Sequence, residues 1–575
     1  MADPSNADIA AAFDELADLY ELDGAIVHRV LAYRGAAKAV RDAPQSVAAL
    51  TRAGRVQELP GIGATLEEKL VALVETGTIP ALEKLRAKFP PGLVDLTRLP
   101  GLGPKRARRL FDELGIDSLQ ALETAARQKR LQDLRGLGAA FEQKMLEALE
   151  QGAGDAPQGR IVLHRAREVG EQIVAALAAH PAADRVELAG SARRMADSVK
   201  DLDIVAAATD TRALLDAFTA LDVIESSSAP GENAARARTH NGISIDLRVV
   251  APEQFGNLLQ HFTGSQAHNV GVRERAVRRG LHVSEYGILD DATGETLRCA
   301  SEEEVYERLG LTWVPPELRE NRGELDLTEV PPLVTVEDLK GDLHMHTVAS
   351  DGHNTIEEMA RAALDRGYEY IAITDHSASH GFGNDVSPDE LRRQIDRVRA
   401  VDATLDGIEL LIGTESNIGV DGALDYDDEL LAELDWVIAS VHTRFAMPAE
   451  QMTARVIAAC EHPSCDAIGH LTGRKIEQRA AYAIDVDAVI EAAARTGTML
   501  EINGAPDRRD LNDVHARAAA QAGVPILIDS DAHRTTTLAN VRWGVATARR
   551  AWLGPAAVAN TLPWAEFAPL RKRAR

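Results

Sequence analysis

The chain has 575 residues, of which 45% are apolar, 26% charged and 4% aromatic, and its net charge is −26. This length exceeds what one hydrophobic core can organise, so we expect several domains, and the composition excludes wholesale disorder. There is no run of about 18 uncharged apolar residues and no secretory signal order at the N-terminus, so we expect a cytoplasmic protein without membrane contact.

The distribution of charge matters more than its sum. Phosphate contacts need clustered Lys and Arg, and residues 51–150 hold 16 basic and 14 acidic side chains, whereas residues 321–575 hold 25 and 41. The acidity is therefore concentrated in the C-terminal part, where metal sites could use it. Cys299, Cys460 and Cys465 are too few for a disulfide framework, and we interpret them as ordinary thiols.

Residues 1–90 are predicted to form short helices, because apolar residues recur at three-and-four spacing. A repeat begins here, with LPGIG at 59–63, LPGLG at 99–103 and LRGLG at 134–138, each followed by a helix-forming stretch. Glycines between two short helices leave backbone N–H groups free to hold a phosphate, although a tight turn without a ligand fits any single copy as well.

The repeat resembles the helix-hairpin-helix binder of the DNA backbone. The second copy leads into a basic run that begins at Lys105, whereas the third lacks both the proline and the basic run and is open to a purely structural role. On this resemblance the residues that would contact DNA are Gly61, Gly63, Gly101, Gly103 and Lys105.

From about residue 160, β-branched runs alternate with helical stretches, which is an α/β pattern. Asp201 and Asp203 face the same side if they lie on a strand, and Asp246 lies on what should be a neighbouring strand. Three carboxylates suit Mg²⁺ or Mn²⁺, and two ions would permit phosphoryl transfer from a nucleotide to a 3′-hydroxyl. Exposed acidic strand ends without a metal are common, so the order of the surrounding motif carries the prediction.

That order is the turn GSARR, at 190–194, followed by the two aspartates. Gly190 and Ser191 could present a backbone amide and a hydroxyl to a triphosphate, and Arg194 could offer a donor fork. These residues resemble the nucleotidyltransferase fold and, within it, the family X DNA polymerases.

The resemblance continues in HFTGSQAHNVGVRERAVRRG at 261–280. It implies that Phe262 and Gly264 line the sugar pocket, that Asn269 reaches the minor-groove edge of the base and that Arg273 approaches the template. His261 stands where the family more often has a tyrosine, which puts discrimination against ribonucleotides in question.

The same resemblance covers the N-terminus. His28, Arg29, Tyr33 and Arg34 match the family's small domain that holds a 5′-phosphate, and Lys69 aligns with its Schiff-base lysine. Most lysines on such a helix are merely solvated, so sugar-phosphate lyase activity and a plain surface lysine both remain open.

Residues 315–338 combine prolines and charges without periodicity and are predicted to be a linker. Beyond them, strand-like runs alternate with helical segments, which predicts βα units closing toward a barrel. Nearly every one of these strands ends in a histidine or carboxylate: His344, His346, Asp351, His376, Glu415, His442, His470, Asp531 and His533.

A single histidine after a strand is usually structural, but so complete a set is hard to assign to chance. The strand ends of a barrel converge on one pocket, and imidazoles mixed with carboxylates suit Mn, Zn or Fe better than Mg. The motifs resemble the PHP family, the polymerase and histidinol phosphatase domain. The resemblance implies that these nine residues bind up to three Mn²⁺ or Zn²⁺ ions, which activate water to trim DNA 3′ ends. His353, His380, His462 and His515 match no motif and are expected to be surface or structural residues.

The order of motifs is that of bacterial family X DNA polymerases with a C-terminal PHP domain. We therefore expect a multidomain α and α/β protein with helical helix-hairpin-helix N-terminal domains, an α/β palm of the nucleotidyltransferase type and a distorted (β/α)7-type barrel. The predicted ranges are 1–90 and 91–155 for the helical domains, 156–250 for the palm, 251–314 for a thumb-like domain, 315–338 for the linker and 339–575 for the PHP domain.

The expected function is gap filling in DNA repair with 3′-end trimming, with DNA and deoxynucleoside triphosphates as partners and a monomer as the working state. Two alternatives remain. The chain could be a DNA-end-binding protein with one vestigial site and a small-molecule phosphatase, or the PHP metals could support only the fold.

Overall fold

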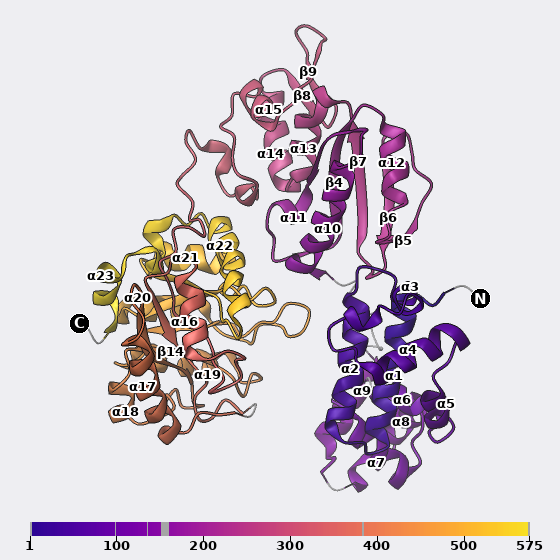
Figure 1. The fold of residues 1–575 in the computed structure, drawn as a ribbon, viewed down its shortest axis with the longest axis vertical. Helices are drawn as coiled ribbons and strands as arrows, with labels where there is room; N and C mark the ends of the chain where they lie inside the picture. Colours follow the sequence, from indigo (N-terminus) through magenta and orange to yellow (C-terminus); the bar gives the residue numbers. More distant parts are fainter. Residues whose placement is uncertain are drawn as a thin grey trace. The chain divides into compact units, whose positions relative to one another are not determined.

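The computed structural model describes residues 3–572 except 98, 100, 135, 151–159, 382 and 383. The chain divides into two compact units, each with segments that are discontinuous in sequence (Figure 1). The first comprises 1–160, 168–186 and 200–250, and the second comprises 161–167, 187–199 and 251–575. Each unit is described by itself, and the domain boundaries expected from the sequence stay predictions.

The N-terminal part of the first unit is helical, as predicted. Ser5 begins the first helix with a capping box, in which its side chain and that of Asp8 each accept a backbone N–H. One hydrophobic core runs through all these helices, from Ile9 to Ala148. The helices are α1 (Asn6–Leu22), α2 (Val27–Asp42), α3 (Val47–Arg52), α4 (Ala64–Thr76), α5 (Pro80–Arg86), α6 (Pro91–Thr97), α7 (Pro104–Leu114), α8 (Leu119–Arg127) and α9 (Ala139–Glu150).

The palm is a five-stranded mixed sheet with strand order β2-β4-β7-β6-β5. Strands β4 and β7 run parallel, whereas β6 is antiparallel to both β7 and β5. Apolar side chains of β4 and β7 fill the sheet's core, and helix α12 packs against these strands. The elements are α10 (Leu163–Ala178), β2 (Ala183–Leu188), β4 (Leu202–Ala208), α12 (Thr211–Thr219), β5 (Ile224–Ser227), β6 (Ala234–Thr239) and β7 (Ser244–Val250).

The second unit begins with a small α/β region around a three-stranded antiparallel sheet, β10-β9-β8. Its elements are α11 (Gly190–Arg193), α13 (Phe255–Thr263), α14 (Gln266–Val277), β8 (Leu281–Ser284), β9 (Gly287–Asp290), β10 (Thr296–Leu297) and α15 (Glu302–Arg308), and β1 (Ile161–Val162) pairs with β3 (Ser198–Val199).

The segment 315–338 is irregular, as its prolines predict, apart from two short 3-10 turns. It is nevertheless firmly packed. Arg319 is completely buried and donates to both carboxylate oxygens of Glu302, and the carboxylate of Glu324 lies 2.6 Å from Nδ1 of buried His268. Charges that suggest an exposed linker in sequence therefore pair with partners from distant segments, as burial of charge requires.

The C-terminal part is a barrel of seven parallel strands in sequential order, each followed by helical cover, which confirms the predicted fold class. A parallel bridge between Met345 and Ala532 joins the first strand region to the last. The strands are β11 (Gly341–Asp342), β12 (Tyr370–Ile373), β13 (Glu409–Asn417), β14 (Trp436–Ser440), β15 (Ala467–Ile468), β16 (Met499–Asn503) and β17 (Ile526–Asp529). The helices are α16 (Ile356–Leu364), α17 (Pro388–Asp402), α18 (Asp428–Ala432), α19 (Ala449–Glu461), α20 (Val486–Thr496), α21 (Asp513–Gln521), α22 (Val541–Arg550) and α23 (Trp564–Phe567).

The barrel strands separate two cores by alternation. Ile371 and Ile373 of β12 join the core shared with the helices, whereas Tyr370 joins a second core made of strand residues and the C-terminal segment. Phe567 of α23 stacks on Tyr370 at 4.8 Å and lies 5.9 Å from Trp436. Because Tyr370 and Trp436 begin their strands, this aromatic cluster closes the N-terminal mouth and leaves the opposite mouth for chemistry.

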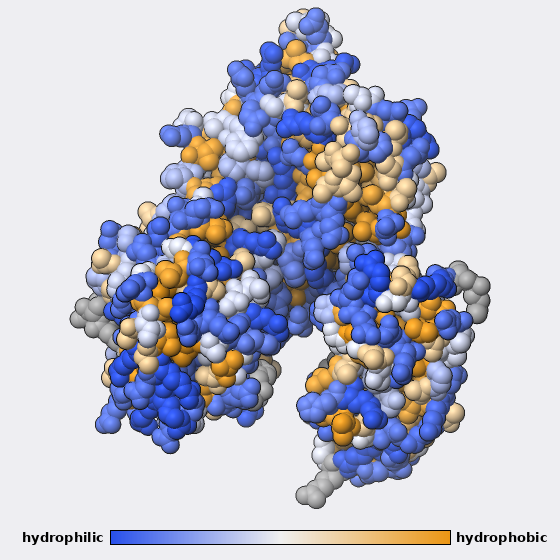
Figure 2. Space-filling model, viewed as in Figure 1, coloured by the Kyte–Doolittle hydropathy of each residue, from blue (hydrophilic) through white to orange (hydrophobic). Residues whose placement is uncertain are grey.

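The face drawn in Figure 2 is predominantly hydrophilic, with apolar side chains in scattered areas. Within the described part of the chain, every helix is too short or too polar to cross a membrane.

Candidate active sites

The nine side chains predicted to bind metal in the barrel all lie at or just beyond the C-terminal ends of its strands. His344 and His346 follow β11, His376 follows β12, and Glu415 lies within β13. The others occupy the strand ends and loops that meet at the same mouth, namely Asp351, His442, His470, Asp531 and His533. The parallel topology therefore gathers residues that are up to 189 positions apart (344 to 533).

Glu415 lies at the centre of this gathering. Its Oε2 is 2.8 Å from Nδ1 of His376, and its Oε1 is 2.8 Å from Nε2 of His470 and 3.2 Å from Nε2 of His442. His344 approaches the same Oε1 at 3.4 Å. Nε2 of His346 lies 3.7 Å from Oε2, so one buried carboxylate faces five imidazoles.

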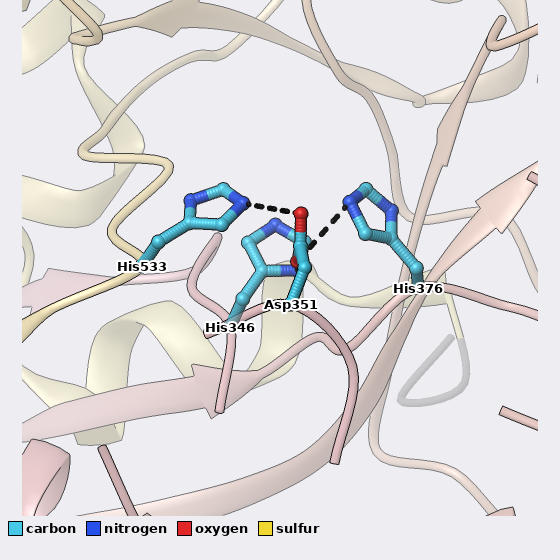
Figure 3. A group of neighbouring side chains, drawn as sticks. All are labelled: His346, Asp351, His376 and His533. Carbon is cyan, nitrogen blue, oxygen red and sulfur yellow. Dashed lines mark ion pairs between the residues drawn. The ribbon is translucent and has the colours of Figure 1, made fainter. Parts of the chain in front are cut away.

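A second carboxylate, Asp351, lies between the rings of His533 and His376, the latter of which also contacts Glu415 (Figure 3). Its oxygens are 3.3 Å from Nε2 of His533 and 3.6 Å from Nε2 of His376, and the ring of His346 lies beside them. Asp531 completes the set, with Oδ1 3.3 Å from Nε2 of His346. Together the side chains form four overlapping groups whose ligand atoms lie within 4.8 Å of one another.

The donor set fits divalent cations. Neither ring nitrogen of His346 or of His442 makes a hydrogen bond within the described part of the chain, although both rings are buried. Buried polar atoms are normally satisfied, so ring nitrogens that lie near carboxylates without forming hydrogen bonds to them suggest that ions bind between them.

The palm brings the predicted polymerase carboxylates together. Asp203 and Asp246 are direct partners in the register of β4 and β7, and Asp201 is exposed immediately before β4. Arg248 donates to Asp246 at 2.8 Å and Arg236 at 3.1 Å. These two guanidinium groups fix the orientation of the Asp246 carboxylate. Asp203, its partner on the neighbouring strand, faces the same side of the sheet.

The predicted nucleotide-binding residues lie in the second unit. Gly190, with φ of 59°, begins the one-turn helix α11, which also contains Ser191. Arg194 is already engaged, because its Nε donates to Glu320 at 3.0 Å and Nη1 to the carbonyl of Thr263 at 2.7 Å. In this structure, the guanidinium of Arg194 is hydrogen-bonded to the C-terminal end of α13.

The segment after α13 is similarly tied in place. Asn269 donates to the carbonyl of His261 at 2.7 Å and accepts from Gln260 at 3.1 Å. The rings of His261 and Phe262 are 5.4 Å apart, and burial lowers the pKa of His261. Gly264 ends α13 in the left-handed region, where glycine is favoured, and Arg273 lies on α14.

The first glycine of each copy of the repeat has a positive φ. Gly61, Gly101 and Gly136 have φ of 78°, 89° and 88°, which favours glycine. Gly63 and Gly103 begin α4 and α7. Gly136 of the third copy therefore has a φ similar to that of its counterparts, despite the departure in sequence, and Lys105, which follows the second copy, is exposed.

The predicted 5′-phosphate residues are close to one another. Tyr33 stacks on Tyr20 at 5.2 Å, Arg29 lies over Tyr20, and Nζ of Lys69 is 5.9 Å from the ring of Tyr33. Arg34 is paired with Asp18 and Glu21. His28 is exposed on α2.

Comparison with family models agrees with this arrangement. Residues 4–79 match a helix-hairpin-helix domain, and residues 93–151 match a SAM-like helix-hairpin-helix tandem. Residues 258–320 match the DNA polymerase beta thumb, and residues 342–505 match the PHP domain.

One relative matches this chain over nearly the whole length of both proteins. The chain is 37% identical over 548 residues to the DNA polymerase/3′-5′ exonuclease PolX of Bacillus subtilis strain 168, covering 95% of both chains. The chain belongs to the PolX family. Other relatives match about a third of this PolX member: a probable phosphatase of Caldanaerobacter subterraneus, TTE1963, is 35% identical over 33% of this chain and 75% of its own, and the probable phosphatase YcdX of Escherichia coli is 32% identical over 34% and 80%. The PHP match and the four side-chain groups together imply dependence on divalent metal.

The sequence analysis did not identify several residues that hold the predicted metal ligands of this PolX member in place. Glu501 of β16 is completely buried, and its carboxylate lies 2.6 Å from Nδ1 of His344 and accepts the backbone N–H of His470 at 2.6 Å. Asp375 accepts from Thr347, which fixes the loop that carries Asp351. Asp375 follows β12 and Glu501 lies within β16, so both occur in the same strand segments as the nine predicted ligands. That position was the one signal in the sequence that could have identified them.

His380 and Arg508 were also missed. His380 is buried, stacks on His376 at 4.2 Å and pairs with Asp385, so it is part of the site rather than a surface residue. Nε of Arg508 is 3.3 Å from the carboxylate of Asp531. Only the path of the intervening loops brings these two side chains to the barrel mouth.

Burial and charge divide the imidazoles of this PolX site into two kinds. Burial lowers the pKa of His346 to about 4, and the neighbouring His533 and His376 add to the effect. Burial alone would also lower the pKa of His533, but the hydrogen bond and charge of Asp351 and the charge of Asp531 raise it to about 9. The same competition raises the pKa of His344 well above its usual value. Some rings therefore hold protons that a bound cation would displace.

Residues 194–197, which belong to the second unit of this PolX member, are held by arginines of the barrel in the same unit. Arg550 donates to the carbonyl of Arg194 at 2.8 Å, and Arg474 to the carboxylate of Asp197 at 2.8 Å. Arg509, which is almost fully buried, donates to the carbonyls of residues 195 and 196 at 2.9 and 3.0 Å. The last residue of the predicted triphosphate turn and the three residues after it are thus hydrogen-bonded to the barrel.

Proposed function

We propose that this chain is a DNA polymerase that fills short gaps during DNA repair and that its PHP barrel trims DNA 3′ ends as a 3′–5′ exonuclease. We further propose that it works in the cytoplasm, where bacterial DNA lies. The polymerase assignment is supported most by the register of Asp203 with Asp246 in a member of the PolX family. The exonuclease assignment is supported by the imidazoles and carboxylates gathered around Glu415.

In the polymerase reaction, the primer's 3′-hydroxyl loses its proton to solvent and its oxygen bonds to the α-phosphorus of the nucleotide, while the bond from that phosphorus to the bridging oxygen breaks and pyrophosphate leaves. Asp201, Asp203 and Asp246 would hold Mg²⁺ or Mn²⁺, which lowers the cost of the charge that develops on both oxygens. Arg236 and Arg248 keep the oxygens of Asp246 in fixed positions. On the family resemblance, the triphosphate would be held by Gly190, Ser191 and Arg194.

The remaining contacts are proposed from the same resemblance. Phe262 and Gly264 would line the sugar pocket, Asn269 would reach the base and Arg273 the template. DNA would be bound by the glycine turns at Gly61, Gly63, Gly101 and Gly103, with Lys105, Arg29, Tyr33 and Arg34. The lyase role of Lys69 stays a prediction.

In the exonuclease reaction, a water oxygen bonds to phosphorus, the bond to the preceding nucleotide's 3′ oxygen breaks and that oxygen takes a proton. Up to three Mn²⁺ or Zn²⁺ ions held by the nine residues would supply activated water and a polarised phosphoryl group. Glu415 faces several imidazoles, so it would keep the ions in one compact group. Arg508 adds a positive charge beside them.

The test is a gapped DNA with a labelled primer, incubated in Mn²⁺ with and without nucleotides. Asp203→Ala should reduce extension at least a hundredfold and leave trimming intact. His344→Ala should reduce trimming and leave extension intact, because the palm carboxylates and the barrel ligands serve different reactions.

Two matched controls sharpen this test. Asp216→Ala removes an exposed palm carboxylate paired with Arg212, and His462→Ala removes a histidine outside the barrel mouth. Both should behave as wild type. Unchanged extension by Asp203→Ala would contradict the polymerase assignment, and unchanged trimming by folded His344→Ala would contradict the exonuclease assignment.

A further inference from the structure

A cavity of about 430 Å³ opens beside the metal-binding groups. One wall consists of ligand residues such as Glu415 and His533, and the other contains Phe445, Lys475, Arg479 and Arg508. This volume falls within the usual range for small-molecule sites. The second wall carries three cations and an aromatic ring, which the metal chemistry does not itself require.

The cations are held together by the backbone. Lys475 and Arg479 pair in an antiparallel bridge across a tight turn, with N–H···O distances of 2.8 and 2.7 Å. Directly opposed residues in such a pair project to the same side, so two positive side chains are placed next to each other. Like charges in this position repel. Asp507, which also lines the cavity, lies 3.7 Å from Nζ of Lys475 and offsets part of this repulsion, and a substrate anion would offset more of it.

Arg508 extends the positive surface toward the metal groups. Its Nε faces Asp531, but its Nη1 is buried and has no hydrogen-bond partner in the described part of the chain. Burial, together with the charge of Arg508, lowers the pKa of Arg479. Among the described residues, Nη1 of Arg508 therefore lacks the partner that a buried guanidinium nitrogen usually has, although Nε of the same side chain faces Asp531.

Phe445 and Arg479 add a planar surface. The guanidinium carbon of Arg479 lies 4.0 Å from the ring centroid of Phe445, and the ring of Tyr482 lies 6.1 Å from that of Phe445 at an interplanar angle of 17°. Nucleic-acid-binding proteins stack unpaired bases on aromatic rings and on arginine planes of this kind. A simple phosphate ester has no planar base and could not stack on such a surface.

We propose that this cavity is a subsite for the 3′-terminal nucleotide of a DNA strand: Lys475 and Arg508 bind its phosphate, and Arg479, packed on Phe445, stacks on its base. The proposal rests on the proposed exonuclease function and names the part of the substrate that the barrel reads. It separates this barrel from one that accepts any small phosphate ester.

The test compares two diesters that both release p-nitrophenolate: thymidine 5′-(p-nitrophenyl phosphate), which carries a base, and methyl p-nitrophenyl phosphate, which does not. With the full chain in Mn²⁺, kcat/KM should be higher for the thymidine ester by roughly 5- to 150-fold, which corresponds to about 1–3 kcal/mol for one stacked base. Arg479→Met should bring this ratio close to one. Arg479→Lys should do the same, because it keeps the charge and loses the plane.

Arg495→Met is the matched control, since Arg495 is an exposed arginine of α20 paired with Glu461. Its ratio should equal that of wild type. Calorimetric titration with thymidine 5′-monophosphate and with ribose 5-phosphate gives a readout without turnover: wild type should prefer the former, and Arg479→Met should lose the preference.

A wild-type ratio near one, or equal losses on both esters in Arg479→Met, would overturn the subsite while leaving DNA trimming in place. If the esters are cleaved too slowly, the first cleavage of a labelled strand ending in a normal or an abasic residue gives the same ratio. A wild type that trims no DNA and cleaves neither ester would instead contradict the proposed exonuclease.

Discussion

Glu501→Gln tests whether a buried carboxylate behind the imidazoles controls metal affinity. Glu501 lies 2.6 Å from Nδ1 of His344 and is enclosed by the barrel. Its negative charge is the leading influence that raises the pKa of His344 against the effect of burial. Glutamine has the same shape and can still accept from the ring, but it carries no charge.

The magnitude follows from the hydrogen bond that changes. A hydrogen bond to a charged group contributes about 1.5–3 kcal/mol and a neutral one about 0.5–1.5 kcal/mol, so the substitution removes about 1–1.5 kcal/mol. At about 1.4 kcal/mol per factor of ten, the ion beside His344 should bind roughly 5- to 12-fold more weakly. Loss of a ligand's supporting partner commonly costs about 10- to 100-fold, so tenfold is the expected change.

The assay is calorimetric titration of metal-free chain with Mn²⁺, with circular dichroism to verify the fold. Glu409→Gln serves as the control, because Glu409 lies exposed at the other end of a barrel strand. Equal Mn²⁺ dissociation constants for wild type and Glu501→Gln would refute the reasoning, since the charge of Glu501 would then have no influence on the ligand in front of it.

Two further predictions concern protonation. Because the pKa of His533 is raised to about 9, this ring is protonated at pH 7 in the metal-free chain, so Mn²⁺ binding should release protons and weaken as the pH falls; a binding enthalpy that is the same in buffers of different ionisation enthalpy would contradict this. Burial works against the charge of Glu302, but Arg319 and Arg193 lower its pKa to about 2, so its stabilisation is complete above about pH 4.5 and lost as the pH falls toward 2. Hydrogen exchange of α13 and α15 should therefore show a loss of about 3 kcal/mol over that range, and a Glu302→Gln variant should show little of this pH dependence.

The barrel site could be predicted because its geometry follows from topology. Parallel strands present their C-terminal ends at one mouth, so a histidine at each strand end, such as His344 or His442, is brought near the others whatever the loops do. The same reasoning applies to Asp203 and Asp246, whose pairing requires only that their strands be neighbours. In both cases the local pattern carries long-range information.

The supporting residues could not be assigned in this way. Glu501 lies within β16, as Glu415 lies within β13, but a sequence does not distinguish a carboxylate that faces an ion from one that faces a ligand's ring. His380 depends on how its loop folds back onto His376. Arg319 and Glu324 have the composition of a solvated linker, and only their partners in distant helices explain their burial.

Because barrel arginines hold residues 194–197, removing the barrel should affect the part of the chain that carries the predicted polymerase residues. A fragment ending before the barrel would keep every predicted polymerase residue, yet the carbonyls of residues 194–196 and the Asp197 carboxylate would lose the donors described above. The barrel is therefore structural scaffolding for the turn in front of it as well as a catalyst, and a shortened polymerase of this type would need new partners for that loop.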